Sequence, residues 1–336
     1  MTEMTTKWLG LTLTSPIVVG AGPLSHDEEA IASAVDHGAG AVVMYSLFEE
    51  QVAHEHLAAH HFVDARADRD AEARQTGSDV DVFAMGADAY LKQLERLRRR
   101  VNVPVVASLN GTTPGGWTEY ARACSVRGAS AIELNLYDVV TATDENSRFV
   151  EERQLAIVDD VLRTVDIPVA VKISPFYTSI PAFVRRLEKA GAAGVTLFNR
   201  FCQPDIDLDT LTVDRRLTLS HPHELPLRLH ALAILSPAIS MSLACSGGVH
   251  TGRDAAKALL CGADVMQLTS ALLQHGPSHV GVVLGELTAW LTASGYASSD
   301  DARGALALST TPDAYLWERV NYIRVLDGWR PRVPRH

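Results

Sequence analysis

The sequence has few cysteines and lacks the paired spacings that hold a metal or an iron–sulfur cluster. Its four cysteines, Cys124, Cys202, Cys245 and Cys261, lie far apart and form no Cys-x-x-Cys pair. Such pairs supply the ligands of many zinc and iron–sulfur sites, and dense cysteine patterns mark disulfide-rich secreted domains. The sequence therefore excludes a cluster built on such pairs and argues against a disulfide framework.

Long apolar runs and an excess of basic residues are also missing. No run is long enough to cross a bilayer, and residues 1–10 contain no apolar core of signal-peptide length. We therefore expect a cytoplasmic protein without a membrane partner. The chain has 30 Lys and Arg against 40 Asp and Glu, a net charge of -10. Because nucleic acids and anionic membranes bind basic faces, this balance argues against both, but not against a small anionic substrate.

The glycine motif of a dinucleotide site is absent as well. Gly20-Ala21-Gly22 closes the first predicted strand, but no Gly-x-Gly-x-x-Gly is completed and no acidic residue follows at the required distance. We therefore predict no NAD site of the Rossmann type. Side chains this small instead leave room for a ring system to lie against the backbone.

Short β-rich runs alternate with amphipathic stretches along the 336 residues. The runs are almost continuously apolar, which is typical of strands buried on both faces. Strands are predicted at Ile17–Gly22, Ala41–Ser46, Val103–Asn110, Ala131–Tyr137, Val169–Ser174, Gly194–Asn199, Ile239–Gly247 and Asp264–Ser270. Helices are predicted at Glu28–His37, Tyr90–Arg100, Thr118–Arg127, Leu155–Val165, Ile180–Ala190 and Gly252–Cys261. Eight such units predict one α/β domain, residues 1–336, folded as a (β/α)8 TIM barrel; an open doubly wound sheet is the alternative.

Three segments fall outside this alternation. Trp8–Leu13, followed by Ser15-Pro16, predicts an N-terminal hairpin that plugs the bottom of the barrel. Phe48–Val82 and Arg200–Pro226 are long inserts after the second and sixth strands. Active sites of such barrels lie where the strands end, so the inserts are predicted as lids, with surface loops as the alternative.

Two strand ends predict a phosphate site. Ser246-Gly247-Gly248 ends the seventh strand and Thr269-Ser270 ends the eighth. Consecutive glycines let backbone N–H groups approach an oxygen anion, and the helix that begins near Thr251 adds its positive end. The loops after strands seven and eight commonly hold phosphate in such barrels. The alternative is a turn that needs glycine for packing alone.

Lys172 lies in the otherwise apolar run Val169–Ser174. Burial of an unpaired ammonium is costly, so this lysine needs an anionic or polar partner. Two functions are open. Lys172 could face the N1/O2 edge of a flavin, or it could form an imine as the lysine of an aldolase that acts on a phosphorylated sugar.

Asn110, Asn135 and Asn199 each end a predicted strand. A carboxamide offers two donors and an acceptor, which suits the edge of a planar imide or pyrimidine ring. Each residue alone is typical of a turn or a cap. Together they favour recognition of a flat, hydrogen-bonding ligand.

These segments resemble the dihydroorotate dehydrogenase superfamily of FMN barrels, in the correct order over most of the chain. Leu9-Gly10-Leu11 with Ser15-Pro16-Ile17 resembles the family's opening motif, and Glu133-Leu134-Asn135-Leu136 resembles the strand before its catalytic loop. The resemblance implies FMN as the cofactor. It implies contacts from Gly20, Ala21, Gly22, Ser46, Asn110, Asn135, Lys172, Asn199, Ser246, Gly247, Gly248, Thr269 and Ser270.

The substrate side departs from the family pattern. In Asn135-Leu136-Tyr137-Asp138-Val139-Val140, Asp138 aligns with the family's Cys or Ser base, and Tyr137 is the second candidate for moving a proton. Tyr45 stands where the family has a lysine, and Glu49–Met85 contains no counterpart of its substrate-binding asparagine loop. The resemblance thus implies the divergent, dihydroorotate dehydrogenase-like branch. Its expected reaction is FMN-dependent oxidation or reduction of a CH–CH or C=C bond in a small planar substrate, with Asp138, Tyr137 and Lys172 as catalytic residues.

Two other functions remain open beside this oxidoreductase. One is an aldolase or lyase that uses Lys172, and the other is a catalytically idle flavin-binding subunit that relays electrons. Without an NAD motif or iron–sulfur ligands, electrons would come from the substrate, quinone, fumarate, oxygen or a separate redox protein; a homodimer is also open. The histidines of the first insert and Cys202 are predicted as a solvated lid and an inert thiol, so no metal site is predicted.

Overall fold

The computed structural model describes residues 2–49, 51, 86–111, 113, 117–200, 204–214 and 218–328. Most of the first predicted insert, with its histidines, lies outside the described residues, and so does Cys202. The predictions of a lid, a solvated histidine cluster and an inert thiol there stay predictions.

Eight parallel strands form a closed barrel, as predicted. They are β3 (Ile17–Val19), β4 (Ala41–Phe48), β5 (Val105–Asn110), β6 (Ala131–Asn135), β7 (Val169–Ile173), β8 (Gly194–Leu197), β11 (Ser242–Ser246) and β12 (Val265–Leu268). Consecutive strands pair in chain order, and β12 pairs with β3 to close the ring. This closure rules out the open doubly wound sheet.

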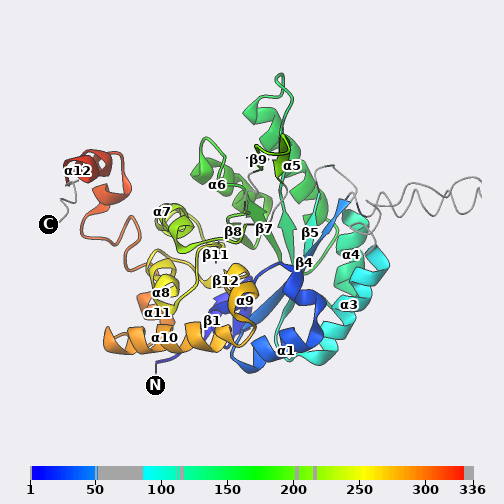
Figure 1. The fold of residues 1–336 in the computed structure, drawn as a ribbon, viewed down its shortest axis with the longest axis horizontal. Helices are drawn as coiled ribbons and strands as arrows, with labels where there is room; N and C mark the ends of the chain where they lie inside the picture. Colours follow the sequence, from blue (N-terminus) through cyan, green and yellow to red (C-terminus); the bar gives the residue numbers. More distant parts are fainter. Residues whose placement is uncertain are drawn as a thin grey trace, which may run out of the picture.

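Helices surround the barrel (Figure 1). They are α1 (Glu28–Asp36), α3 (Ala87–Arg100), α4 (Thr118–Val126), α5 (Ser147–Leu162), α6 (Ile180–Ala190), α7 (Leu225–Leu235), α8 (Gly252–Leu260), α9 (Ser270–His275), α10 (His279–Ala293) and α11 (Ser299–Ala302). The last helix of the described residues is α12 (Val320–Gly328), which Figure 1 shows at the edge of the molecule, away from the strands. No helix in the described ranges is long and apolar enough to span a membrane.

The predicted boundaries are wrong at several elements. Helix α5 begins at Ser147 rather than Leu155, because the Asn146 side chain accepts a hydrogen bond from the Phe149 amide and caps the helix early. Strand β11 begins at Ser242 rather than Ile239, because the Ile239 amide still donates to the end of α7. Most strands also end before the predicted residue, so some of the predicted ligand residues follow the strands: Gly20, Ala21, Gly22, Asn199, Gly247, Gly248 and Thr269.

The predicted N-terminal hairpin is present and closes the bottom of the barrel. Strands β1 (Thr6–Trp8) and β2 (Leu11–Leu13) pair antiparallel around a turn at Leu9 and Gly10. The Leu9 amide donates to the Ser242 hydroxyl at 2.9 Å, and a Cβ on Gly194 would lie 2.6 Å from the Leu9 side chain. The plug therefore packs directly against the first residues of β8 and β11.

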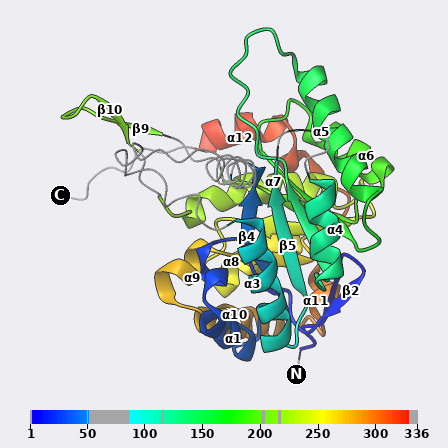
Figure 2. The same ribbon diagram turned by 90° about the vertical axis from the view of Figure 1, so that its right-hand side faces the viewer.

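The second predicted insert contains an antiparallel hairpin, β9 (Asp205–Asp207) and β10 (Thr212–Asp214). Figure 2 shows this hairpin projecting away from the barrel. The Asp207 carboxylate accepts hydrogen bonds from the Asp209 and Thr210 amides, so this aspartate shapes the turn between the two strands. A 3-10 turn, η3 (Pro222–Glu224), then leads the chain into α7.

Candidate active site

A pocket of about 240 Å³ opens where the barrel strands end. It brings together most residues predicted to surround the cofactor. Those that line it are Ala21, Gly22, Ser46, Asn135, Lys172, Asn199, Ser246, Gly247, Gly248, Thr269 and Ser270. Gly20 and Asn110 are buried at the ends of β3 and β5 but are not part of the lining.

One end of the pocket is the glycine turn after β11. Gly247 and Gly248 both have positive φ, 91° and 79°, a region that side chains with a Cβ rarely adopt. A Cβ on Gly248 would also lie 2.7 Å from the Leu225 amide nitrogen. Helix α8 follows, and its N-terminus is fixed by a capping box between Thr251 and Asp254. Backbone N–H groups of such a turn and a helix N-terminus suit an oxygen anion.

Arg228 supports this turn from behind, and it was not among the predicted site residues, although an arginine in the apolar run Leu225–Leu235 could have indicated it. Its side chain is 5% exposed, and Nε donates to the Ser246 carbonyl at 3.0 Å. Nη1 donates to the Glu224 carbonyl at 2.8 Å, and a Cβ on Gly247 would lie 2.9 Å from Nη2. Burial lowers the pKa of Arg228. Arg228 lies in the largely apolar helix α7, and only the packing of α7 on β11 reveals its position behind the turn.

Small residues form the floor of the pocket between β3 and β12. A Cβ on Gly20 would lie 2.5 Å from Thr269 Oγ1, and one on Gly22 would lie 2.6 Å from Thr269 Cγ2. The Gly20 amide donates to the Leu268 carbonyl at 2.8 Å. The two strand ends are thus closer than any larger side chain would permit, as the Gly20-Ala21-Gly22 run led us to expect.

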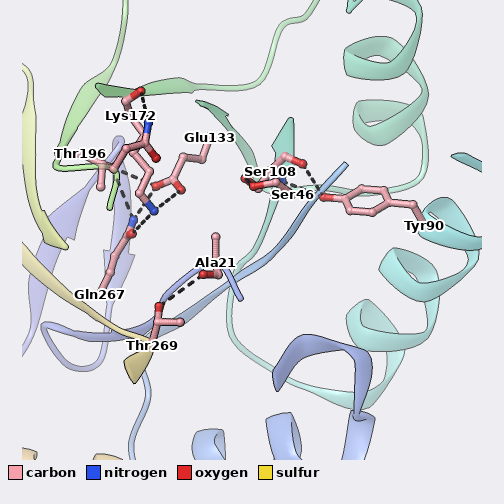
Figure 3. A network of polar contacts seen from close by, with 10 residues as sticks. Ala21, Ser46, Tyr90, Ser108, Glu133, Lys172, Thr196, Gln267 and Thr269 are labelled. Carbon is pink, nitrogen blue, oxygen red and sulfur yellow. Dashed lines mark hydrogen bonds and ion pairs between the residues drawn. The ribbon is translucent and has the colours of Figure 1, made fainter. Parts of the chain in front are cut away.

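Lys172 lies in a buried polar network inside the barrel (Figure 3). Its Nζ donates to Glu133 Oε1 at 3.2 Å and to Gln267 Oε1 at 3.4 Å. The other oxygen of Glu133 accepts from Thr196 Oγ1 at 2.9 Å and from Gln267 Nε2 at 2.6 Å. The Glu133 side chain is completely buried. The sequence predicted an anionic or polar partner for Lys172, and the structure shows that this partner is Glu133, on the neighbouring strand β6.

Two predicted asparagines frame the same end of the pocket. Asn199 Nδ2 donates a hydrogen bond to the Lys172 carbonyl at 3.4 Å. Asn135 is 8% exposed, and its Oδ1 has no hydrogen-bond partner among the described residues. A buried acceptor without a partner is costly unless a ligand or water supplies the donor. Because Asn135 lines the pocket, a hydrogen-bonding ligand there would satisfy it.

Ser46 is held by a second network on β4 and β5 (Figure 3). Its hydroxyl lies 2.8 Å from the Ser108 hydroxyl, and Tyr90 Oη bonds both the amide and the carbonyl of Ser108. Burial raises the pKa of Tyr90 well above its ordinary value, so the phenol stays protonated. Tyr90 thus fixes the strand ends rather than serving as a proton donor in the pocket.

A histidine lies behind the glycine turn. His250 is 8% exposed, its Nε2 has no partner among the described residues, and burial lowers its pKa.

Ser220 links the second insert to the glycine turn. Its amide donates to Ser270 Oγ at 2.9 Å, and its hydroxyl accepts from the Gly248 amide at 3.5 Å.

The predicted base lies apart from this pocket. Asp138 lines a different pocket, of about 400 Å³, beside the loop that follows β6. Its Oδ2 accepts a hydrogen bond from Arg153 Nη2 at 2.7 Å, and Arg153 also bonds Glu145. Tyr137 lines neither pocket. In this conformation the structure does not bring the two candidates for proton transfer together with Lys172.

Comparison with known proteins relates the chain to dihydroorotate dehydrogenases. The model of the family described as dihydroorotate dehydrogenase matches residues 79–291. The putative dihydroorotate dehydrogenase A (fumarate) of Aeropyrum pernix is 29% identical over 217 residues, 63% of this chain and 71% of that protein. The catalytic subunit of dihydroorotate dehydrogenase B (NAD(+)) of Methanocella arvoryzae is 27% identical, over 82% of this chain and 89% of its own. The chloroplastic dihydropyrimidine dehydrogenase (NADP(+)) of Arabidopsis thaliana is 24% identical, over 88% and 75%.

Proposed function

Because the chain belongs to the dihydroorotate dehydrogenase family, we propose that it is an FMN-dependent oxidoreductase. Its proposed substrate is a small planar molecule with a CH–CH or C=C bond that is oxidised or reduced. The observation that carries the proposal is the pocket at the strand ends. That pocket combines a glycine turn of positive φ at one end with Lys172 and an unsatisfied Asn135 acceptor at the other.

The residues present fit a flavin phosphate and ring. Gly247 and Gly248 would hold the phosphate through backbone amides, with Ser270 at the start of α9 on the other side. Gly20 and Gly22 keep the floor free of side-chain bulk. Donors on the edge of the flavin ring would satisfy Asn135 Oδ1, which has no partner among the residues described.

When bound, FMN supplies hydride transfer at its ring, and the protein tunes that chemistry by charge and hydrogen bonds. Lys172 would contribute a fixed positive charge, since Glu133 and Gln267 hold its Nζ in place. An imine-forming lysine must attack as the neutral amine, whereas Lys172 uses its N–H groups as donors to Glu133 and Gln267. For this reason we rank the flavin contact of Lys172 ahead of the aldolase or lyase function.

We further propose that Asp138 moves the proton on the face of the substrate opposite the flavin. Asp138 follows the strand that carries Asn135, so a shift of the loop 136–146 would bring it toward the pocket. Its ion pair with Arg153 is partly exposed, at 17% for Asp138 and 23% for Arg153, and such pairs are weak enough to exchange. Tyr137, its neighbour, is the second candidate.

The proposal is tested first by the cofactor. Protein purified without added cofactor should be yellow, show a flavin absorption band and release FMN on denaturation. The flavin should then be reduced anaerobically and reoxidised with a panel of enones, fumarate and orotate. Colourless protein that is trapped by borohydride with a keto-sugar phosphate would support the lyase instead.

Asp138 is tested separately from the cofactor. We expect Asp138→Asn to retain FMN and to lose substrate-dependent turnover of the flavin by about 100-fold or more, the usual contribution of general acid–base catalysis. Asp144→Asn, on the same loop, is the matched control and should turn over normally. Normal turnover of Asp138→Asn would remove Asp138 from the mechanism. Reducible flavin that no substrate reoxidises, even in the unaltered protein, would favour an idle electron-relay subunit.

A further inference from the structure

Helix α12 presents an apolar face to the outside of the molecule. Figure 1 shows the helix at the edge, away from the strands. With 3.6 residues per turn, four large side chains share one side of it, and they are 68%, 61%, 61% and 57% exposed: Tyr322, Ile323, Val325 and Leu326. A surface helix normally turns such a side toward the core. The apolar face of α12 is therefore available to a partner.

The polar side of α12 is the side that contacts the rest of the chain. Arg324 lies opposite the apolar face, and its guanidinium carbon is 4.3 Å from the centroid of the Tyr315 ring. Its Nη1 also donates to the Tyr315 hydroxyl at 2.6 Å. Tyr315 belongs to the 3-10 turn η4 (Ala314–Trp317), where Trp317 Nε1 donates to the Leu306 carbonyl at 3.0 Å. These contacts hold Arg324 against the anchored turn and leave the apolar face outward.

The charge of this segment is opposite to that of the whole chain. Residues 320–336 contain one acidic residue, Asp327, and four arginines: Arg324, Arg330, Arg332 and Arg335. Their net charge is thus +3, in a chain whose net charge is -10. A basic segment that carries an apolar helix face is typical of helices that lie on anionic membranes.

Aromatic residues support the same partner. Tyr322 lies on the apolar face, and Trp329 follows α12 directly in the sequence. The rings of tyrosine and tryptophan combine an apolar body with a polar group, so both residues are enriched where a membrane meets water.

The size of the apolar face favours a lipid surface over a second copy of the chain. A nine-residue helix is about 14 Å long, whereas a standard protein interface buries about 800 Å² on each partner. Four side chains on so short a helix supply only part of that area. A lipid surface sets no such minimum, because each apolar and each basic residue adds to the binding separately.

We propose that α12 and the residues after it attach the protein to the surface of an anionic membrane. The apolar face would enter the boundary between head groups and acyl chains, and the arginines would meet lipid phosphates. Nine residues are far fewer than the roughly 20 of a membrane-spanning helix, so the attachment is peripheral.

This inference corrects the expectation that the acidic chain has no membrane partner. Attraction depends on the charge that faces the lipid, and the acidic remainder of the chain confines the contact to the basic segment. The inference is independent of the proposed function, because the segment lies beyond residues 79–291, which match the family.

The test measures co-sedimentation of the full-length protein with lipid vesicles. Vesicles of equal parts phosphatidylcholine and phosphatidylglycerol are compared with vesicles of phosphatidylcholine alone. We expect binding to the anionic vesicles to be about tenfold or more tighter, because each basic residue near the surface adds to the attraction. The difference should shrink as the salt concentration rises.

The apolar contribution is tested on the face itself. Ile323→Gln with Leu326→Gln should weaken binding about tenfold or more, since two side chains no longer enter the lipid. Ile206→Gln with Leu208→Gln is the matched control, because these residues of the hairpin β9–β10 are 66% and 80% exposed. The control should bind like the unaltered protein, and an equal Tm shows that each variant is folded.

The basic contribution is tested after α12. Arg330→Gln with Arg332→Gln should weaken binding to the anionic vesicles and leave binding to phosphatidylcholine unchanged. Arg148→Gln with Arg163→Gln removes the same charge from two exposed arginines, at α5 and just after it, and should change neither.

Three results would overturn the inference. One is equal binding to both kinds of vesicle, or binding to neither. Another is unchanged binding of Ile323→Gln with Leu326→Gln. The third is a lipid-free dimer, seen by sedimentation velocity, that the same double variant dissociates, because it would assign the apolar face to a second copy.

Discussion

The two sides of the strand ends are built in different ways. On the side of β11, β12 and β3, close backbone packing and glycines of positive φ shape the pocket, and Arg228 is buried behind them. On the side of β6, the loop 136–146 carries Asp138 in a partly exposed ion pair, and Val139 and Val140 are 53% and 39% exposed. The first side depends on backbone geometry that few residues permit, whereas the second depends on side chains that can be exchanged. A turn that depends on glycines therefore tolerates fewer substitutions than a loop held by exchangeable side chains.

The largest effect should come from the buried ion pair of Glu133 and Lys172 inside the barrel, which Gln267 of β12 links to the cofactor side. Glu133→Gln leaves Lys172 buried without a carboxylate, and breaking such a pair costs about 3–5 kcal/mol. We expect a marked fall of the urea midpoint and of Tm. The double variant Glu133→Gln with Lys172→Gln should recover most of that loss, because it removes the uncompensated charge. If the single variant were as stable as the unaltered chain, the rigid character of this side would be refuted.

The glycine turn should be the next most sensitive position. In Gly248→Ala the alanine backbone would have to adopt a φ of +79°, and the new Cβ would lie 2.7 Å from the Leu225 nitrogen. We expect a loss of about 2 kcal/mol or more, from backbone strain of about 1–2 kcal/mol together with the clash. FMN affinity should fall at least tenfold. Gly295→Ala is the control, because Gly295 has a φ of +81° but open space around it. It should show the strain alone and bind FMN normally; equal effects of the two substitutions would mean that the clash at the turn is absent.

On the loop side a comparable ion pair should matter little for stability. Arg153→Gln removes the partner of Asp138 and Glu145, and partly exposed pairs contribute about 0–1 kcal/mol. We expect a change in unfolding free energy below about 1 kcal/mol, with FMN retained, as measured by denaturant titration and by the flavin band. A loss as large as that of Glu133→Gln would erase the contrast between the two sides.

The smallest effect should be the pH dependence that His250 contributes on the cofactor side. Burial lowers the pKa of His250 below its ordinary value of 6.5, so the folded protein favours the neutral ring. Stability from this residue is present above pH 6.5 and is lost as the pH falls through the lower, folded-state pKa. Burial raises the pKa of Asp264 to about 6, which acts in the opposite direction, so we expect acidification from pH 7 to pH 5 to lower Tm less, or raise it more, in His250→Gln than in the unaltered protein. An identical pH profile for both proteins would exclude His250 as its source.

Much of the fold could be predicted from the sequence, because continuous apolar runs such as Ala41–Met44 are typical of parallel strands covered on both faces, and eight of them favour a closed barrel. The glycine turn could be predicted too, since a local motif determines its backbone. The partner of Lys172 could not, because Glu133 is adjacent only once β6 and β7 pair in register. The positions of Arg228 and Arg200 near Glu224 likewise could not be predicted, because helix α7 was not predicted at the end of the second insert.

The sequence alone thus determined the strand and helix alternation, the small residues of the pocket floor and the positive φ at Gly247 and Gly248. These are local properties, since hydrophobic period and the absence of a Cβ act on the residue that carries them. The tertiary structure alone decided which charges meet: Lys172 with Glu133, Asp138 with Arg153, and two arginines with one Glu224. Electrostatic partners are set by distance in space, and residues far apart in the chain become neighbours only when the barrel closes.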